Sequence, residues 1–214
     1  MPRHPPIQNP AQLLENMVLI RDLLEKNGIT CFIMYGTLLG AIREKNFIAH
    51  DDDVDFGIFG KDYDKLIIML PEILAHGFTL FSERNGRLLQ FNRKGEQVDI
   101  FAAYPIMTLR GRRWDLDAQE TVAWSYFKEL DTIEFLGHTF NMPRNPEKIL
   151  RNLYGSTWRI PIKDVRNRKD LSYQIKRILK NPGLTFFYLS RYMKKKWRKY
   201  TEKKNYHADS NNTQ

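Results

Sequence analysis

Four aspartates occupy positions 51, 52, 53 and 55 within the segment "AHDDDVDFGIF". Asp53 and Asp55 alternate with Val54 and Phe56, which is the pattern of a strand with one apolar face. Side chains two positions apart on a strand lie on the same face, about 6.5–7 Å apart. Two carboxylates held in this way can share a divalent cation, and Mg²⁺ is usually bound by one or two carboxylates together with substrate phosphates. A solvated acidic turn is the alternative that three consecutive aspartates alone would favour.

Another carboxylate, Asp99, lies in "QVDIF", where apolar residues on both sides predict a second strand. Asp99 could complete a cluster with Asp53 and Asp55. Such a cluster repels itself unless a cation occupies it. We therefore expect these residues to be both the metal ligands and the catalytic residues, with Mg²⁺ as the ion and Mn²⁺ as the alternative.

A turn at Gly36-Thr37 follows the apolar segment "ITCFIMY" and precedes "LLGAIREK", which is predicted to be a short helix. Such a turn exposes backbone N–H groups and a hydroxyl where a phosphate can bind. Arg43, on the same short helix, could bind a phosphate through two N–H donors, and an ordinary surface arginine is the alternative. A phosphate-binding turn beside metal-binding carboxylates is typical of phosphoryl transfer.

These segments carry a family resemblance. "YGTLLGAIR…FIAHDDDVDFGI" resembles the LicD family, which includes bacterial phosphocholine transferases and, more distantly, fukutin and fukutin-related protein. The family looks like a branch of the polymerase β-type nucleotidyltransferases, whose pattern of a Gly-Ser/Thr-like turn, Asp-hydrophobic-Asp and a later Asp is matched here. "LYGSTWRIP" (153–161) also resembles a LicD segment, so the resemblance covers roughly residues 10–165. Ala49-His50 departs from the Pro-Trp that the family usually shows before the acidic run.

The resemblance implies transfer of phosphocholine or an alditol phosphate from a CDP-choline or CDP-alditol donor to a glycan or glycolipid hydroxyl, with release of CMP. Asp53 and Asp55 would hold one or two Mg²⁺, and Asp99 would complete the site and take the proton of the acceptor. Gly36, Thr37, Arg43 and Asp51 would bind substrate. The alternatives are a template-independent nucleotidyltransferase acting on RNA or a small molecule, and a binding module without activity.

Aromatic residues are dense around positions 114–127, where Trp114, Trp124, Tyr126 and Phe127 lie. They could form an aromatic cage for a quaternary ammonium group such as that of choline. Core packing is the alternative, because aromatic residues at this density are normal in cores.

The order of predicted elements indicates an α+β fold. A helix from Asn9-Pro10 to Gly28 and a helix over 61–76, kinked or split at Pro71, alternate with strands over 29–35 and 54–59. A hairpin through Lys94-Gly95 and a helix over 145–155 follow. With the resemblance, we expect a nucleotidyltransferase-like mixed sheet flanked by helices over residues 1–165. A basic C-terminal helical extension (166–204) and a disordered tail (205–214) follow.

The net charge of +9 is concentrated near the C-terminus. Residues 163–204 contain fifteen Lys and Arg against three Asp and Glu. Within 184–200 the aromatic and apolar residues form one helical stripe and basic residues fill most of the rest, which is typical of a helix in an anionic membrane interface. Packing on the core is the alternative. We expect a cytoplasmic enzyme, peripheral on the inner face of the membrane, with no nucleic acid partner.

Overall fold

The computed structural model describes residues 5–84, 86–109, 111–116 and 121–161. The chain divides into two compact units, residues 1–107 with 112–163 and residues 108–111 with 164–214. All the site residues predicted above belong to the first unit. The predicted extension (166–204) and tail (205–214) lie outside the described residues, so the predicted domain boundaries stay predictions.

The described helical segments comprise five α-helices, two 3₁₀ turns and one π-helical turn. They are α1 (Pro10–Lys26), α2 (Tyr35–Leu39), the π-helical η1 (Gly40–Glu44), η2 (Gly60–Asp62), α3 (Tyr63–Ile68), α4 (Leu70–Ala75), η3 (Trp124–Phe127) and α5 (Pro146–Tyr154). None of these helices is both long enough and apolar enough to cross a membrane.

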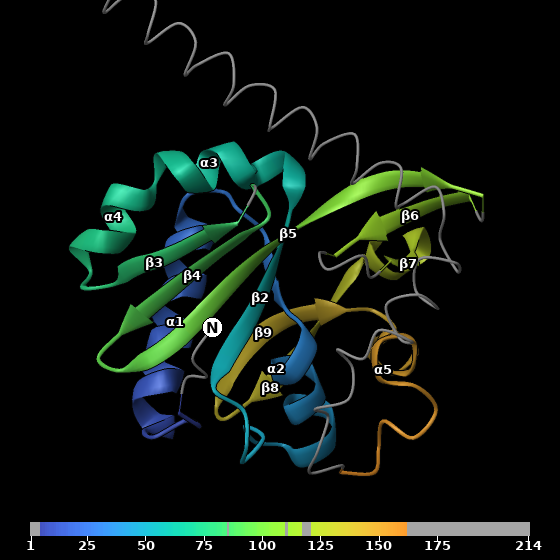
Figure 1. Cartoon of the computed structure of the whole chain (residues 1–214), viewed down its shortest axis with the longest axis horizontal. Helices are drawn as coiled ribbons and strands as arrows, with labels where there is room; N and C mark the ends of the chain where they lie inside the picture. Colours follow the sequence, from blue (N-terminus) through green and yellow to red (C-terminus); the bar gives the residue numbers. More distant parts are fainter. Residues whose placement is uncertain (1–4, 85, 110, 117–120, 162–214) are drawn as a thin grey trace, which may run out of the picture. The chain divides into compact units, whose positions relative to one another are not determined.

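The described strands form one mixed sheet and a separate hairpin. They are β1 (Cys31–Ile33), β2 (Asp53–Phe59), β3 (Thr79–Arg84), β4 (Leu88–Arg93), β5 (Glu96–Thr108), β6 (Gly111–Asp115), β7 (Thr121–Ala123), β8 (Leu130–Phe135) and β9 (His138–Pro143). The main order is β1-β2-β5-β4-β3, with β6 beside β5 and β7 beside β6 (Figure 1). β2 and β5 run parallel, whereas the β1–β2, β4–β5 and β3–β4 pairs are antiparallel. The predicted α+β class with a mixed sheet and flanking helices is confirmed.

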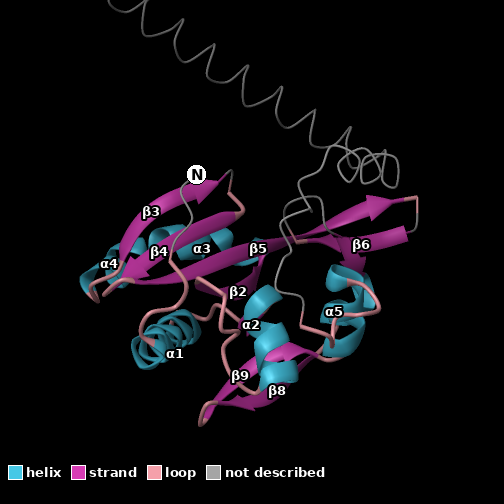
Figure 2. Ribbon diagram, turned by 60° about the horizontal axis from the view of Figure 1, so that its bottom comes forward, coloured by secondary structure: helices cyan, strands magenta, loops and turns pink. Residues whose placement is uncertain are grey.

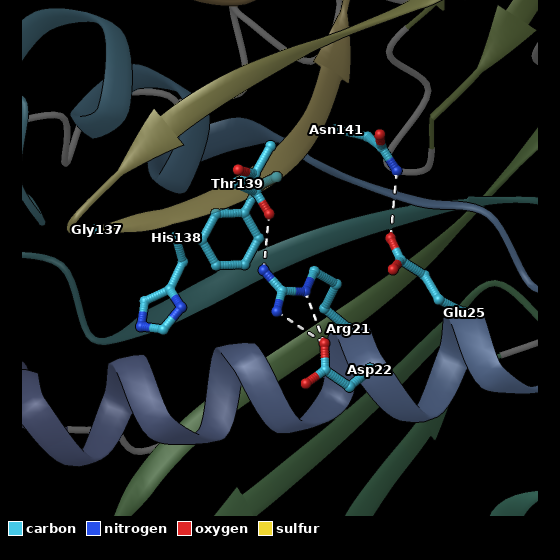
Figure 3. Close-up of a pocket in the computed structure, with 8 residues that line it drawn as sticks. Arg21, Asp22, Glu25, Gly137, His138, Thr139 and Asn141 are labelled. Atoms are coloured by element: carbon cyan, nitrogen blue, oxygen red, sulfur yellow. Dashed lines mark hydrogen bonds and ion pairs between the residues drawn. The ribbon is translucent and has the colours of Figure 1, made fainter.

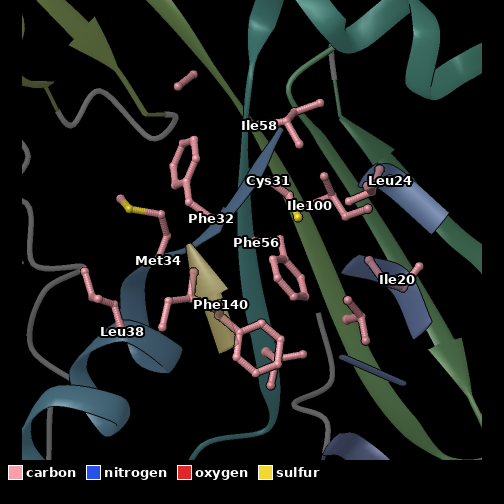
Figure 4. Close-up of a cluster of buried hydrophobic side chains, with 14 of the residues drawn as sticks. Ile20, Leu24, Cys31, Phe32, Met34, Leu38, Phe56, Ile58, Ile100 and Phe140 are labelled. Atoms are coloured by element: carbon pink, nitrogen blue, oxygen red, sulfur yellow. The ribbon is translucent and has the colours of Figure 1, made fainter. Parts of the chain in front are cut away.

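Helix α1 covers the apolar face of the sheet. Asn9 caps it by accepting a hydrogen bond from the backbone N–H of Gln12 at 3.1 Å, and Pro10 starts the first turn. The buried side chains Ile20 and Leu24 of α1 lie against Phe56 of β2 and Ile100 of β5 (Figure 4). Because residues alternate along a strand, this packing directs Asp53 and Asp55 to the other face.

The structure differs from the sequence-based boundaries at the end of β1. Tyr35 was predicted to end a strand, but β1 ends at Ile33 and Tyr35 begins α2 with a positive φ of 44°. Gly36 and Thr37 therefore lie inside the first turn of a helix rather than in a turn before it. The predicted split of the helix over 61–76 is confirmed: α3 and α4 are separated at Met69, because Pro71 has no N–H to continue the first helix and instead lies in the first turn of the second.

Figure 2 shows the β8–β9 hairpin set apart from the main sheet, on the side where α1 and α2 lie. Phe140 of β9 packs on Phe56 of β2 with ring centroids 6.3 Å apart, and Asn141 donates to the carbonyl of Cys31 at 3.0 Å. The hairpin therefore closes the apolar core beside α1.

Candidate active site

The parallel pairing of β2 with β5 brings the three predicted carboxylates together. Asp55 lies directly opposite Asp99, and Asp53 lies opposite Gln97. One carboxylate oxygen from each of Asp53, Asp55 and Asp99 lies within 4.8 Å of the others. Asp55 and Asp99 are buried and Asp53 is half-buried at the start of β2. The donor set consists of hard oxygens at a spacing that a single divalent cation can bridge.

Burial raises the pKa of each of these carboxyl groups. Desolvation, followed by the charges of Asp99 and Asp51, raises the pKa of Asp53 to about 8. The pKa of Asp55 is raised well above its ordinary value by desolvation and then by the charge of Asp53. Desolvation raises the pKa of Asp99 to about 6, against the hydrogen bonds from Gln97 and Gln90. Ionising all three carboxyl groups therefore costs free energy that a bound cation would offset.

The start of α2 fixes Asp55. The backbone N–H of Gly36 donates to Oδ2 of Asp55 at 3.0 Å, and the backbone N–H of Asp55 donates to Oγ1 of Thr37 at 2.7 Å. Both groups of the predicted phosphate-binding turn are thus bonded to a carboxylate residue in this structure. Their contact with a substrate phosphate stays a prediction.

Asp51 lies against the same turn. A Cβ added to Gly36 would stand 2.2 Å from Oδ2 of Asp51, so the absence of a side chain lets this carboxylate approach the helix start. The carbonyl of Asp51 accepts from the backbone N–H of Ile7 at 2.9 Å, and carboxylate oxygens of Asp51, Asp52 and Asp53 also lie within 4.8 Å of one another. Desolvation and then the charge of Asp52 raise the pKa of Asp51 to about 6.

Two glutamines that sequence reasoning missed complete the cluster. Nε2 of Gln97 donates to Oδ1 of Asp99 at 2.8 Å and reaches Oδ2 of Asp53 at 3.5 Å, while Nε2 of Gln90 donates to Oδ2 of Asp99 at 2.8 Å. Both oxygens of Asp99 are therefore fixed by neutral amides. Gln97 stands two positions before Asp99 on one strand, and that spacing was the available signal. The place of Gln90 depends on the register of β4 against β5, which no local pattern gives.

Arg43 forms its contacts with groups outside the carboxylate cluster. Its Nε pairs with Glu44 at 2.7 Å, and its Nη1 donates to the carbonyl of Trp158 at 2.9 Å. The bond to Trp158 joins η1 to the segment that follows α5. A substrate-binding role for Arg43 stays a prediction, and such a role would require at least one of these bonds to be exchanged.

The aromatic residues near position 120 contact one another. Trp114 and Trp124 stack with centroids 4.3 Å apart, and the guanidinium of Arg112 lies 3.8 Å from the centroid of Trp124. Trp114 and Phe127 are buried. These contacts favour core packing over an aromatic cage.

A second polar region lies between α1 and the β8–β9 hairpin (Figure 3). This α1–hairpin pocket has a volume of about 420 Å³ and is lined by Arg21, Asp22, Glu25, Gly137, His138, Thr139, Phe140 and Asn141. Nη2 of Arg21 pairs with Asp22 and its Nη1 donates to the carbonyl of Thr139, both at 2.7 Å. Phe140 packs on Phe56, so the pocket lies on the apolar side of β2, away from the face of the three carboxylates.

The chain is similar in sequence to several known proteins and similar in fold to a solved structure. The chain is 29% identical to ribitol-5-phosphate transferase FKTN from Macaca fascicularis over 166 residues, covering 70% of this chain and 33% of the relative. It is 44% identical over 63 residues to the uncharacterized protein RP689 of Rickettsia prowazekii, covering 29% of this chain and 24% of the relative. The chain thus spans between a quarter and a third of the length of these relatives.

Among solved structures, the antibiotic-resistance factor ANT(2'')-Ia in solution matches with a TM-score of 0.50 at 13% identity, over 93% of this chain and all of that one. This likeness is one of fold alone. The family model described as "LicD/FKTN/FKRP, nucleotidyltransferase domain" matches residues 28–145, which include β1, β2 and β5 with all three carboxylates. The chain belongs to the LicD/FKTN/FKRP family.

Proposed function

We propose that this protein is a metal-dependent phosphotransferase. It moves an alditol phosphate from a CDP-alditol to a hydroxyl of a cell-surface glycan or glycolipid and releases CMP, with CDP-choline as the alternative donor. The observation that carries the proposal is the convergence of Asp53, Asp55 and Asp99 within 4.8 Å inside a LicD-family domain. The relative named as a ribitol-5-phosphate transferase favours an alditol.

The donor set fits a hard divalent cation. Asp53, Asp55 and Asp99 would hold Mg²⁺, or Mn²⁺, because both ions prefer carboxylate oxygens and leave positions open for phosphate. When bound, the ion supplies positive charge that neutralises the diphosphate and stabilises the transition state. We assign the proton transfer and the positioning of the substrate to residues of this chain.

Asp99 is the residue we assign as general base. Its two oxygens are oriented by the amides of Gln97 and Gln90, and a positioned carboxylate can accept the proton of a hydroxyl. It takes the proton of the acceptor hydroxyl as that oxygen bonds to the phosphorus bearing the alditol. The bond from this phosphorus to the oxygen of the CMP phosphate breaks, and CMP carries that oxygen away.

The predicted substrate contacts surround this centre. Gly36 and Thr37 begin α2 beside Asp55, and Asp51 lies against Gly36. In this proposal the first turn of α2 faces the donor phosphates, since the N–H of Gly36 points toward Asp55. Arg43 stands further along the same helical segment.

The test is a donor panel. Purified full-length protein with Mg²⁺ is given CDP-ribitol, CDP-glycerol, CDP-choline, CTP and ATP, and CMP and pyrophosphate are both measured. We expect CMP from at least one CDP-conjugate, dependent on metal and suppressed by EDTA. Pyrophosphate from CTP or ATP at comparable efficiency would overturn the proposal in favour of a nucleotidyltransferase.

The membrane contact belongs to the same proposal. The apolar stripe and the basic residues of 184–200, which lie outside the described residues, suit an anionic surface on the inner face of the membrane. A lipid-linked acceptor would make this location useful. Co-sedimentation with anionic and neutral vesicles tests it, and equal recovery in both supernatants at low salt would contradict it.

A further inference from the structure

The face of the sheet that carries the carboxylates continues beyond β5. Asp55 of β2 lies opposite Asp99 of β5, Asp99 lies opposite Gln90 of β4, and Gln90 lies opposite Ser82 of β3. Residues paired across neighbouring strands lie on the same face of a sheet. Arg84, two positions after Ser82, therefore shares this face.

One side chain links Arg84 to the carboxylates. The amide of Gln90 donates through Nε2 to Oδ2 of Asp99 at 2.8 Å and accepts through Oε1 from Nη2 of Arg84 at 3.4 Å. A guanidinium is thus held one amide away from the predicted general base.

Arg84 differs from other arginines near the sheet in its ion pairing. Arg43 pairs with Glu44, and Arg93 pairs with Glu15 at 2.7 Å. Arg84 is exposed, and within the described ranges of the chain it takes part in no ion pair. It therefore keeps most of its five N–H donors for a ligand.

We propose that Arg84 is a substrate-positioning residue that binds a phosphate of the donor diphosphate on the β3 side of the site. This inference rests on the proposed function for the identity of the ligand. A diphosphate brought to a cluster of carboxylates needs positive charge on more than one side, and a guanidinium binds two phosphate oxygens at once. Arg84 supplies this charge at the edge of the cluster where it faces solvent.

The experiment compares Arg84→Gln and Arg84→Lys with Arg144→Gln. Arg144 is an exposed arginine that pairs with Glu129 in the described part of the chain, so its replacement removes the same charge elsewhere. The probe is inorganic pyrophosphate with saturating Mn²⁺, measured by calorimetry. Binding of Mn²⁺ alone is measured by electron paramagnetic resonance, and KM and kcat are measured with the best CDP-conjugate.

We expect Arg84→Gln to weaken pyrophosphate binding by about 10-fold or more, the usual loss for a charge-assisted bond, and to raise KM more than it lowers kcat. Arg84→Lys should restore part of the affinity. Mn²⁺ alone should bind Arg84→Gln at least as tightly as wild type, because a nearby positive charge is gone. Arg144→Gln should stay within about two-fold of wild type in every measurement, as expected for an exposed ion pair.

The outcomes separate this inference from the proposed function. If wild type turns over a CDP-conjugate but Arg84→Gln binds pyrophosphate as tightly as wild type, the inference is wrong and the function stands. If pyrophosphate binding depends on Arg84 while no CDP-conjugate is consumed, the phosphate contact stands and the function is wrong. A wild type that does not bind Mn²⁺-pyrophosphate overturns the inference.

Discussion

The two polar regions of this protein handle charge in opposite ways. In the α1–hairpin pocket, Arg21 pairs with Asp22 and Asn141 reaches Glu25, with 3.5 Å between Nδ2 and Oε1. In the carboxylate cluster, carboxylate oxygens lie within 4.8 Å of one another, and the donors that the described residues bring to them are the amides of Gln97 and Gln90 and the backbone N–H of Gly36. No ion pair to the three clustered carboxylates occurs among the residues that the structure describes.

This difference indicates which of the two regions is the functional site. In the pocket, the guanidinium of Arg21 is balanced by Asp22 of the same helix, so this charge needs no ligand. The cluster is costly to fold without a cation, because buried carboxylates repel one another and lose hydration. Local costs of this kind are expected where a site is built for a ligand rather than for stability.

The largest difference in turnover is expected when one aspartate in each region is replaced by asparagine. Asp53→Asn should lower turnover by on the order of 10³-fold, since it removes a ligand from the predicted metal site. Asp22→Asn, in the pocket, should leave turnover near wild type. CMP release at saturating donor measures both.

The melting temperature of the metal-free protein is the control for folding in the same pair. Asp53→Asn should melt at or above the wild-type temperature, because like-charge repulsion is relieved. A near wild-type kcat for Asp53→Asn would remove Asp53 from the metal site.

The next largest effect is expected when an amide side chain that contacts the carboxylates is replaced. Gln97→Met keeps the length of the side chain but removes the donor to Asp99 and Asp53, so we expect turnover and metal affinity to fall about 10–100-fold, as for other groups that orient metal ligands. Gln12→Met on α1 is the matched control, since Gln12 contacts Asn16 instead. Equal activity of the two variants would show that Asp99 does not need the amide of Gln97 to orient it.

The third prediction concerns how the stability of the metal-free protein depends on pH. The folded-state pKa values of Asp53, Asp51 and Asp99, about 8, about 6 and about 6, are all raised, whereas an unfolded aspartate titrates near 4. Groups with raised pKa values bind protons in the folded state, so their contribution to stability is complete below about pH 4 and is lost as pH rises through about 8.

We therefore expect the metal-free protein to lose on the order of 5 kcal/mol of unfolding free energy between pH 5 and pH 8. Urea denaturation in EDTA at a series of pH values measures this loss. Saturating Mg²⁺ should remove the trend, because the ion binds only the ionised folded site. A flat metal-free profile, or a slope that Asp53→Asn does not reduce, would contradict the assignment.

The smallest effect is expected in the pocket. Arg21→Gln loses the hydrogen bond to the Thr139 carbonyl and the contact of its guanidinium with the Phe140 ring, 4.9 Å from the centroid. We expect a loss of about 1 kcal/mol in unfolding free energy and turnover within two-fold of wild type. A loss of turnover larger than that of Gln97→Met would mean that the pocket takes part in the reaction.

The sequence predicts the parts of the site whose geometry follows from spacing along one strand. The alternation of Asp53 and Asp55 with apolar residues predicts β2 and its two faces, and the apolar neighbours of Asp99 predict its strand. The helix α1 follows equally from its cap and its apolar periodicity. These features depend on local order alone.

What the sequence did not predict depends on contacts between distant segments. Gln90 meets Asp99 only because of the register between β4 and β5, and register is set by packing of the whole sheet. Arg43 bonds to the Trp158 carbonyl, 115 positions away, which no local pattern reveals. Arg84 lies beside the cluster for the same reason, through a strand order in which β3 comes last in the row.

The parallel pairing of β2 with β5 also has a kinetic consequence. Residues 44 positions apart, such as Asp53 and Gln97, must meet before the cluster exists, whereas the β4–β5 hairpin turns within a few residues and can form early. The cation site is therefore expected to assemble near the end of folding. A metal that binds only the finished site should slow unfolding and leave the refolding rate almost unchanged.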